Sequence, residues 1–128
     1  MKNKLILFVC RGNRFRSRIA EEIFNKNASR GFIAESAGMT YQRYNDRATP
    51  TVLREISIEM NMRKPRKLTE QMTKRASKTI VFPGVKTLPT KTKLWPVEDC
   101  HAGDISCIRK GRKQIEKRVK KLLAELKS

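Results

Sequence analysis

The sequence predicts a single α/β domain, in which helices cover both faces of a four-stranded parallel sheet. The chain has 128 residues, enough for one hydrophobic core but not for two, so we expect one domain over residues 1–128. Short apolar runs alternate with stretches of helical periodicity along the chain, which is the pattern of parallel sheets. The clearest unit is a strand, a tight loop and a helix at residues 4–24.

That unit begins with an apolar, β-branched run at residues 5–9, the length expected for a strand buried on both faces. Gly12 and Asn13 follow, and both tolerate positive φ, so the backbone can turn sharply there. Helical spacing starts next, with apolar residues at Ile19, Ala20, Ile23 and Phe24.

The loop between this strand and helix has the composition of an anion site with a nucleophile. The amides of residues 11–17 can turn inward at the positive end of the helix, where an anion is stabilised. The same field favours the nucleophilic thiolate of Cys10. Arg16 can hold two phosphate oxygens at once, and Ser17 can donate a hydrogen bond to the thiolate. The alternative is a core cysteine at a strand end, with Arg16 merely solvated.

The other elements follow from periodicity and capping residues. We expect strands at residues 32–37, 79–82 and 92–95. Helices should begin at Thr49, with Pro50 in the first helical position, at Thr69 and at Asp104. Apolar stripes mark the core-facing sides of the second and last helices: Val52, Leu53, Ile56 and Met60 in one, and Ile105, Ile108, Ile115, Val119, Leu122 and Leu126 in the other.

The charge balance points to anionic partners. Lys and Arg number 30 against 12 Asp and Glu, a net charge of +18. Residues 63–93 hold ten basic residues and a single acid, Glu70, but almost no aromatic residues for base stacking. Binding to nucleic acid is therefore expected to be non-specific at most.

The cysteines and the hydropathy pattern indicate the cellular compartment. Three cysteines without metal-like spacing fit a reducing cytosol better than a disulfide framework. No apolar stretch approaches the length of a membrane span. We expect a cytoplasmic protein that binds neither a membrane nor a metal, and leave its oligomeric state open.

The first loop resembles the phosphate-binding loop of the low-molecular-weight protein tyrosine phosphatases, a family that includes thioredoxin-coupled arsenate reductases. The matching residues are Val9, Cys10, Gly12, Asn13, Arg16, Ser17, Ala20, Glu21 and Phe24. Four positions depart from the family pattern. Arg11 and Arg14 bring charge where small or apolar residues are usual, Phe15 replaces a second cysteine, and Arg18 replaces a proline.

The resemblance implies the strand order 2-1-3-4 and assigns roles to residues. Phosphate would be bound by Arg11, Gly12, Asn13, Arg14, Phe15, Arg16 and Ser17, with Asn13, Ser17 and Ser36 supporting the loop. Asp99 falls where the family has its general acid, but Cys100 stands in place of the proline that follows it. Either Tyr41 or Tyr44 would line the cleft, and Arg63 and Lys64 occupy the positions of a common histidine-arginine pair.

The expected activity is hydrolysis of phosphate monoesters, phosphotyrosine first, through a phosphocysteine on Cys10 and without a cofactor. Arg16 would stabilise the transferred phosphoryl group and Asp99 would protonate the leaving group. Arg11 and Arg14 would favour acidic or multiply phosphorylated substrates, whether proteins or small esters.

Two other functions remain open at this point. Arsenate reduction needs additional cysteines, which in the family follow the third strand; residues 82–85 here contain none, and Cys100 and Cys107 lie elsewhere. The second is a non-catalytic basic module, either a pseudo-phosphatase or a nucleic-acid adaptor.

Overall fold

Four parallel strands lie at the centre of the fold, in the order β2-β1-β3-β4. The computed structural model describes residues 3–28, 30–86 and 92–127. The strands are β1 (Lys4–Cys10), β2 (Phe32–Gly38), β3 (Ala76–Val81) and β4 (Thr92–Leu94). The helices are α1 (Arg16–Asn27), α2 (Ala48–Arg54), α3 (Glu70–Arg75) and α4 (Ile105–Lys127). Both the fold class and the strand order expected from the sequence are confirmed.

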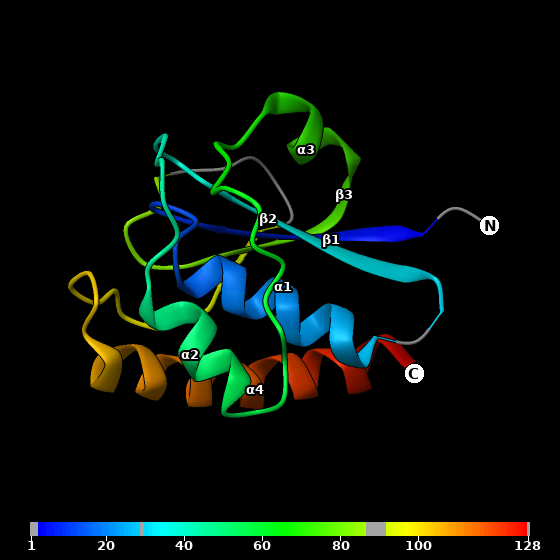
Figure 1. Ribbon diagram of the computed structural model, residues 1–128. Coiled ribbons are helices and arrows are strands. Elements are labelled where there is room, and N and C mark those ends of the chain that lie inside the picture. The colour runs from blue at the N-terminus through cyan, green and yellow to red at the C-terminus, as the bar shows by residue number, and fades with distance from the viewer. Residues whose placement is uncertain (1–2, 29, 87–91, 128) are drawn as a thin grey trace.

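Helices cover both faces of the sheet: α1, α2 and α4 pack on one side and α3 on the other (Figure 1). Strand β1 contributes side chains to the cores on both faces of the sheet, since successive side chains point to opposite faces. Ile6 and Phe8 face the larger core, while Leu7 and Val9 face a smaller cluster that includes Met72 of α3. This double burial explains why residues 5–9 are continuously apolar.

The second helix differs from its sequence-based bounds. It begins at Ala48 and ends at Arg54, so Met60 joins the core from the loop beyond it. The N-cap of this helix is Arg47, whose side chain makes no capping hydrogen bond, and the carboxylate of Asp46, one residue earlier, accepts the amide hydrogen of Ala48 at 2.9 Å. The Thr49 hydroxyl instead donates to the carbonyl of Arg14 at 2.8 Å. The prediction was wrong because this hydroxyl has a tertiary partner.

The last helix matches its prediction closely. Asp104 accepts the amide hydrogen of Cys107 at 3.1 Å and so caps α4. Four members of the predicted stripe are buried, namely Ile108, Ile115, Val119 and Leu122. No helix in the described ranges is both long enough and apolar enough to cross a membrane.

The register of the sheet aligns the carboxyl ends of its strands. Cys10 pairs with Gly38, and the amide of Phe82, just after β3, donates to the carbonyl of Val9 at 3.1 Å. The carboxyl ends of β1, β2 and β3 therefore lie at one edge, where the segment after β4 also arrives. Loops at this edge of a parallel sheet converge on ligands.

Candidate active site

A cavity of about 300 Å³ opens at the carboxyl edge of the sheet. Its walls come from the loop after β1, the segment after β2 and the segment after β4. The lining residues are Cys10, Arg11, Gly12, Arg14, Phe15, Arg16, Thr40, Gln42, Asp46, Asp99, Cys100, His101 and Ala102. The structure thus brings together Cys10, Arg16 and Asp99, the three residues expected to take part in catalysis.

Cys10 is a buried free thiol at the end of β1. Its Sγ lies 2.9 Å from the Ser17 hydroxyl and accepts the amide hydrogen of Asn13 at 3.3 Å. Both contacts place hydrogen-bonding groups on the sulfur, as a nucleophilic thiolate requires.

The loop backbone is arranged so that its carbonyl groups are used and several amides are free. The Arg11 carbonyl accepts the amides of Met39 and Thr40, at 2.9 and 3.0 Å, and the Arg14 carbonyl accepts from Thr49. The amides of Gly12, Arg14 and Phe15 donate to no group within residues 3–28, 30–86 and 92–127. Asn13 adopts the left-handed conformation with φ 56°, which turns the chain at this point. This distribution of donors is that of an anion-binding nest.

Hydrogen bonds from one nitrogen fix the Arg16 guanidinium, while the edge formed by its other two nitrogens makes no hydrogen bond among the described residues. Its Nη1 donates to the carbonyls of Pro83 and Val97, at 3.0 Å each, and its guanidinium carbon lies 5.6 Å from the centroid of the Phe82 ring. The Nε and Nη2 atoms are buried without a hydrogen-bond partner in the described part of the chain. Since buried donors are usually paired, this edge is prepared for an anionic ligand.

Asp99 faces Arg16 from the segment after β4. Its Oδ2 lies 3.5 Å from Arg16 Nη2, and its side chain is 44% exposed. Its Oδ1 accepts the amide hydrogen of Cys100 at 2.9 Å, which fixes the carboxylate without a following proline. Asp46 holds the same segment in place, because its Oδ2 accepts the Gly103 amide at 2.8 Å. Nothing in the sequence pattern predicted this role of Asp46.

Cys100 and Cys107 form a disulfide, with 5.9 Å between their Cα atoms. The expectation that the cysteines would not form disulfides was therefore wrong for this pair. The chain turns at residues 101–104 and enters α4 at Ile105, so the first helical turn brings Cys107 beside Cys100. Cys100 lines the same cavity as Cys10, although it does not follow the third strand as the additional cysteines of the family do.

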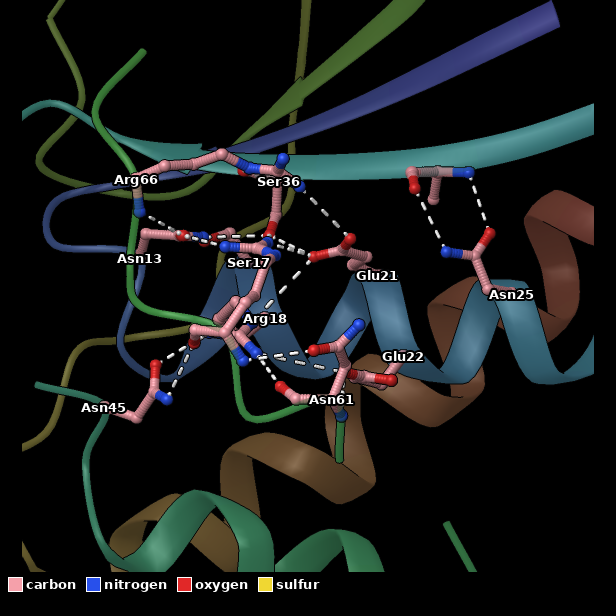
Figure 2. A network of polar contacts seen from close by, with 12 residues as sticks. Asn13, Ser17, Arg18, Glu21, Glu22, Asn25, Ser36, Asn45, Asn61 and Arg66 are labelled. Carbon is pink, nitrogen blue, oxygen red and sulfur yellow. Dashed lines mark hydrogen bonds and ion pairs between the residues drawn. The ribbon is translucent and has the colours of Figure 1, made fainter. Parts of the chain in front are cut away.

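Asn13 connects the loop to its supports through a buried polar network (Figure 2). Its Nδ2 donates to the hydroxyls of Ser17 and Ser36, at 2.8 and 2.9 Å. Its Oδ1 accepts the Arg66 amide at 3.0 Å and Arg63 Nη1 at 3.4 Å. Ser17 and Ser36 therefore both contact the side-chain amide of Asn13.

Glu21 anchors the far side of this network. It accepts a 2.5 Å hydrogen bond from Ser36 and pairs with Arg63 at 2.6 Å and Arg66 at 3.5 Å. Arg63, which stands at the family's histidine position, thus bridges Glu21 and Asn13. We had not assigned a supporting role to either Arg63 or Arg66. The only signal in the sequence was the departure from the family pattern at Arg63, and none marked Arg66.

Arg18, at the usual proline position, is fully buried beside Glu21 and Glu22. It donates to the Asn45 side chain at 2.7 Å and to the carbonyls of Arg63 and Asn61. Burial, together with the nearby charge of Arg63, lowers the pKa of Arg18 to about 10. Burial likewise raises the pKa of Glu22. Arg18 thereby fastens the segment that carries Arg63 to α1.

The cavity walls contain neither of the tyrosines. Tyr41 and Tyr44 are 68% and 72% exposed and lie outside the lining, where Thr40 and Gln42 stand instead. Phe15 packs against α4: a Cβ added to Gly111 would lie 3.0 Å from its ring. This contact accounts for a large apolar side chain at a position where a cysteine is common in the family.

Comparisons with known proteins agree with this arrangement. A family model described as low molecular weight phosphotyrosine protein phosphatase matches residues 5–82, which is more than half of the chain. No protein of curated function matches the chain.

Solved structures extend the similarity to nearly the full length. An arsenate reductase from Archaeoglobus fulgidus is 29% identical, with 93% of this chain and 98% of that one covered and a TM-score of 0.80. The YwlE arginine phosphatase from Geobacillus stearothermophilus is 23% identical, with 97% and 93% covered and a TM-score of 0.83. The tyrosine phosphatase Wzb from Escherichia coli K30 is 18% identical, with 97% and 99% covered and a TM-score of 0.84. The last two establish similarity of fold.

Proposed function

The chain belongs to the low molecular weight phosphotyrosine protein phosphatase family, and we propose that it hydrolyses phosphate monoesters through a phosphocysteine on Cys10. The observation that carries this proposal is the convergence on one cavity of a buried thiol, free loop amides and the edge of Arg16 that makes no hydrogen bond in the described part of the chain. Such an arrangement stabilises charge on a transferred phosphoryl group, which is the main requirement of this chemistry.

In the first step, the Cys10 sulfur attacks phosphorus as the bond from phosphorus to the leaving oxygen breaks. Ser17 and the Asn13 amide stabilise the thiolate, while Arg16 Nε and Nη2 and the loop amides bind the equatorial oxygens. Asp99 gives its proton to the leaving oxygen. Asp99 Oδ2 lies 3.5 Å from Arg16 Nη2, so a phosphate bound by Arg16 would lie beside the Asp99 carboxyl.

In the second step, water attacks phosphorus and the sulfur–phosphorus bond breaks. Asp99, now ionised, accepts the proton of the water, so phosphate and the Cys10 thiolate are released. The first substrates to test are phosphotyrosine peptides, because a phenolate leaving group gains from a positioned acid.

The test is hydrolysis of p-nitrophenyl phosphate and of a phosphotyrosine peptide by the wild type and Cys10→Ser. We expect turnover by the wild type, none by Cys10→Ser, and a covalent phosphoenzyme after rapid quenching of the wild type. Cys107→Ser is the matched control, because it also replaces a cysteine near the cavity but should retain hydrolysis. Absence of turnover in the wild type would favour a non-catalytic anion-binding module instead.

Arsenate reduction is a second candidate, favoured by the disulfide. Cys10 is a free thiol while Cys100, in the same cavity wall, is bonded to Cys107. This is the state that a relay of three thiols would leave behind. The Archaeoglobus fulgidus arsenate reductase, at 29% identity, adds support.

In this relay, arsenate first condenses with the Cys10 thiol and releases water. The Cys100 thiolate then attacks the Cys10 sulfur, and the electron pair of the broken sulfur–arsenic bond leaves with arsenic as arsenite. The Cys107 thiolate attacks Cys100, freeing Cys10, and an external dithiol such as thioredoxin reduces the resulting disulfide.

The two candidates separate in one experiment. Thioredoxin-coupled arsenate reduction should be lost in Cys100→Ser and in Cys107→Ser, whereas hydrolysis of p-nitrophenyl phosphate should persist in both. If wild-type protein with reduced cysteines does not consume arsenate, the relay is excluded and the disulfide is structural.

A further inference from the structure

We propose that the cavity selects phosphate monoesters carrying a second negatively charged group close to the reacting phosphate, and that Arg11 and Arg14 bind that group. The inference rests on the proposed hydrolysis and names its substrate class. It starts from two guanidinium groups that the mechanism above does not use. Both residues line the cavity, and both stand where the family pattern has small or apolar residues.

Arg14 presents a donor that lacks a partner. Its backbone is fixed, because its carbonyl accepts from the Thr49 hydroxyl at 2.8 Å. Its side chain passes over Gly12, where an added Cβ would lie 3.6 Å from Arg14 Cγ. Arg14 Nε is buried without a hydrogen-bond partner in the described residues. A buried donor of this kind is costly unless a ligand pairs with it.

Arg11 is exposed on the same rim, and its stem rests against the turn after β3. A Cβ added to Gly84 would lie 3.0 Å from Arg11 Cδ, so this glycine leaves room for the arginine. Neither Arg11 nor Arg14 forms an ion pair with any residue in the described ranges. Their charges are therefore not neutralised within the described fold.

The acids of the cavity do not compensate for these charges. Asp99 pairs with Arg16, and both oxygens of Asp46 accept backbone amides, from Ala48 and Gly103. With Arg16 reserved for the reacting phosphate, Arg11 and Arg14 leave an excess of positive charge on the rim. The rim should therefore bind a negatively charged group of the substrate.

Among the described residues, the lining contains no tyrosine or tryptophan against which a substrate ring could stack. Its Phe15 is buried and packed against α4, which leaves the small ring of His101 as the exposed aromatic group. A phosphorylated guanidinium would bring a cationic group towards two arginines, so phosphoarginine should be a poor substrate. Charge on the substituent, rather than its shape, should therefore dominate selection.

The test uses substrate pairs in which one member carries the second negatively charged group and the other does not. One pair is propane-1,3-diol monophosphate and bisphosphate; the other is a phosphotyrosine peptide with Gln or Glu after the phosphotyrosine. For the wild type we expect kcat/KM to be about tenfold higher for the charged member of at least one pair, as one charge-assisted contact allows. Arg14→Gln should bring that ratio close to one, and Arg11→Gln should lower it. The exposed Arg43→Gln, which also removes one positive charge but lies outside the lining, should keep the ratio.

Binding separates failure of this inference from failure of the proposed function. Calorimetry with Cys10→Ser measures affinity for the same pairs without turnover, so the selectivity can be read even if no hydrolysis occurs. A preference confined to one pair identifies a small bisphosphate or an acidic phosphopeptide as the source of the second charge. Equal kcat/KM and equal affinity within both pairs would overturn the proposal.

Discussion

Replacement of Asn13 by alanine should damage both stability and turnover, because one buried side chain supports the whole phosphate-binding loop. Asn13 has a φ of 56°, and its side chain donates to Ser17 and Ser36 and accepts from Arg66 and Arg63. Alanine loses these contacts and leaves the partly buried Arg66 amide without its acceptor.

The magnitude follows from the separate contributions. Net losses for neutral hydrogen bonds are about 1 kcal/mol each, and an unpaired buried donor adds to this. A left-handed alanine costs about 1 kcal/mol more than glycine at the same position. Asn13→Ala should therefore lower the free energy of unfolding by roughly 3–5 kcal/mol, a large share of the ~5–15 kcal/mol typical of a domain. Asn13→Gly should lower the free energy of unfolding by about 1 kcal/mol less than Asn13→Ala does. It removes the same side chain, but glycine adopts a positive φ without the steric cost that alanine has.

Asn25→Ala is the matched control (Figure 2). The Asn25 side chain makes two hydrogen bonds to the backbone of Ala34, at 3.0 and 2.8 Å, but lies away from the loop. Its loss should cost about 1–2 kcal/mol, partly offset by the better helix propensity of alanine.

Urea unfolding gives the stabilities, and hydrolysis of p-nitrophenyl phosphate at a temperature where all variants are folded gives the activities. Asn13→Ala should lose at least about tenfold in kcat, because Ser17 is no longer oriented towards Cys10. Asn25→Ala should retain activity. Equal stability of Asn13→Ala and Asn25→Ala, or equal loss of turnover in both, would refute this account of Asn13.

Four further variants, the last of them a control, test other parts of the structure. Asp99→Asn should slow hydrolysis of a phosphotyrosine peptide by about a hundredfold but that of p-nitrophenyl phosphate much less, whose leaving group needs no proton; equal losses would assign Asp99 a structural role. Cys107→Ser should lower the free energy of unfolding of the oxidised protein by about 2–3 kcal/mol through loss of loop closure, and dithiothreitol should abolish the difference in Tm; a difference that persists under reduction would contradict this origin. Gly38→Ala should abolish binding of inorganic phosphate measured by calorimetry, because its Cβ would lie 2.7 Å from the Asn13 nitrogen. Gly12→Ala would place its Cβ 3.3 Å from the flexible Gln42 side chain and in ordinary contact with Arg14 Cγ at 3.6 Å, so it should be tolerated; similar behaviour of the two glycine variants would count against a backbone clash.

The sequence by itself determined those features that depend on neighbouring residues. The run at residues 5–9, the turn residues Gly12 and Asn13 and the helical spacing from Ile19 are local, so they predicted β1, the loop and α1 together. Asp104 likewise predicted the start of α4, because its capping partner lies in the next turn. The strand order came from the family resemblance, and the structure confirms it.

Tertiary structure decided the contacts between segments that are far apart in the chain. Asp46 reaches Gly103, Arg63 and Arg66 reach Asn13, and Arg16 reaches Asp99 only after the sheet edge has brought their loops together. The same folding excludes the two tyrosines from the cavity and turns Cys107 towards Cys100. Periodicity and capping report on local backbone geometry, whereas these pairings depend on how loops from different strands meet. For that physical reason the sequence identified the residues of the loop, and only the fold identified what supports and surrounds it.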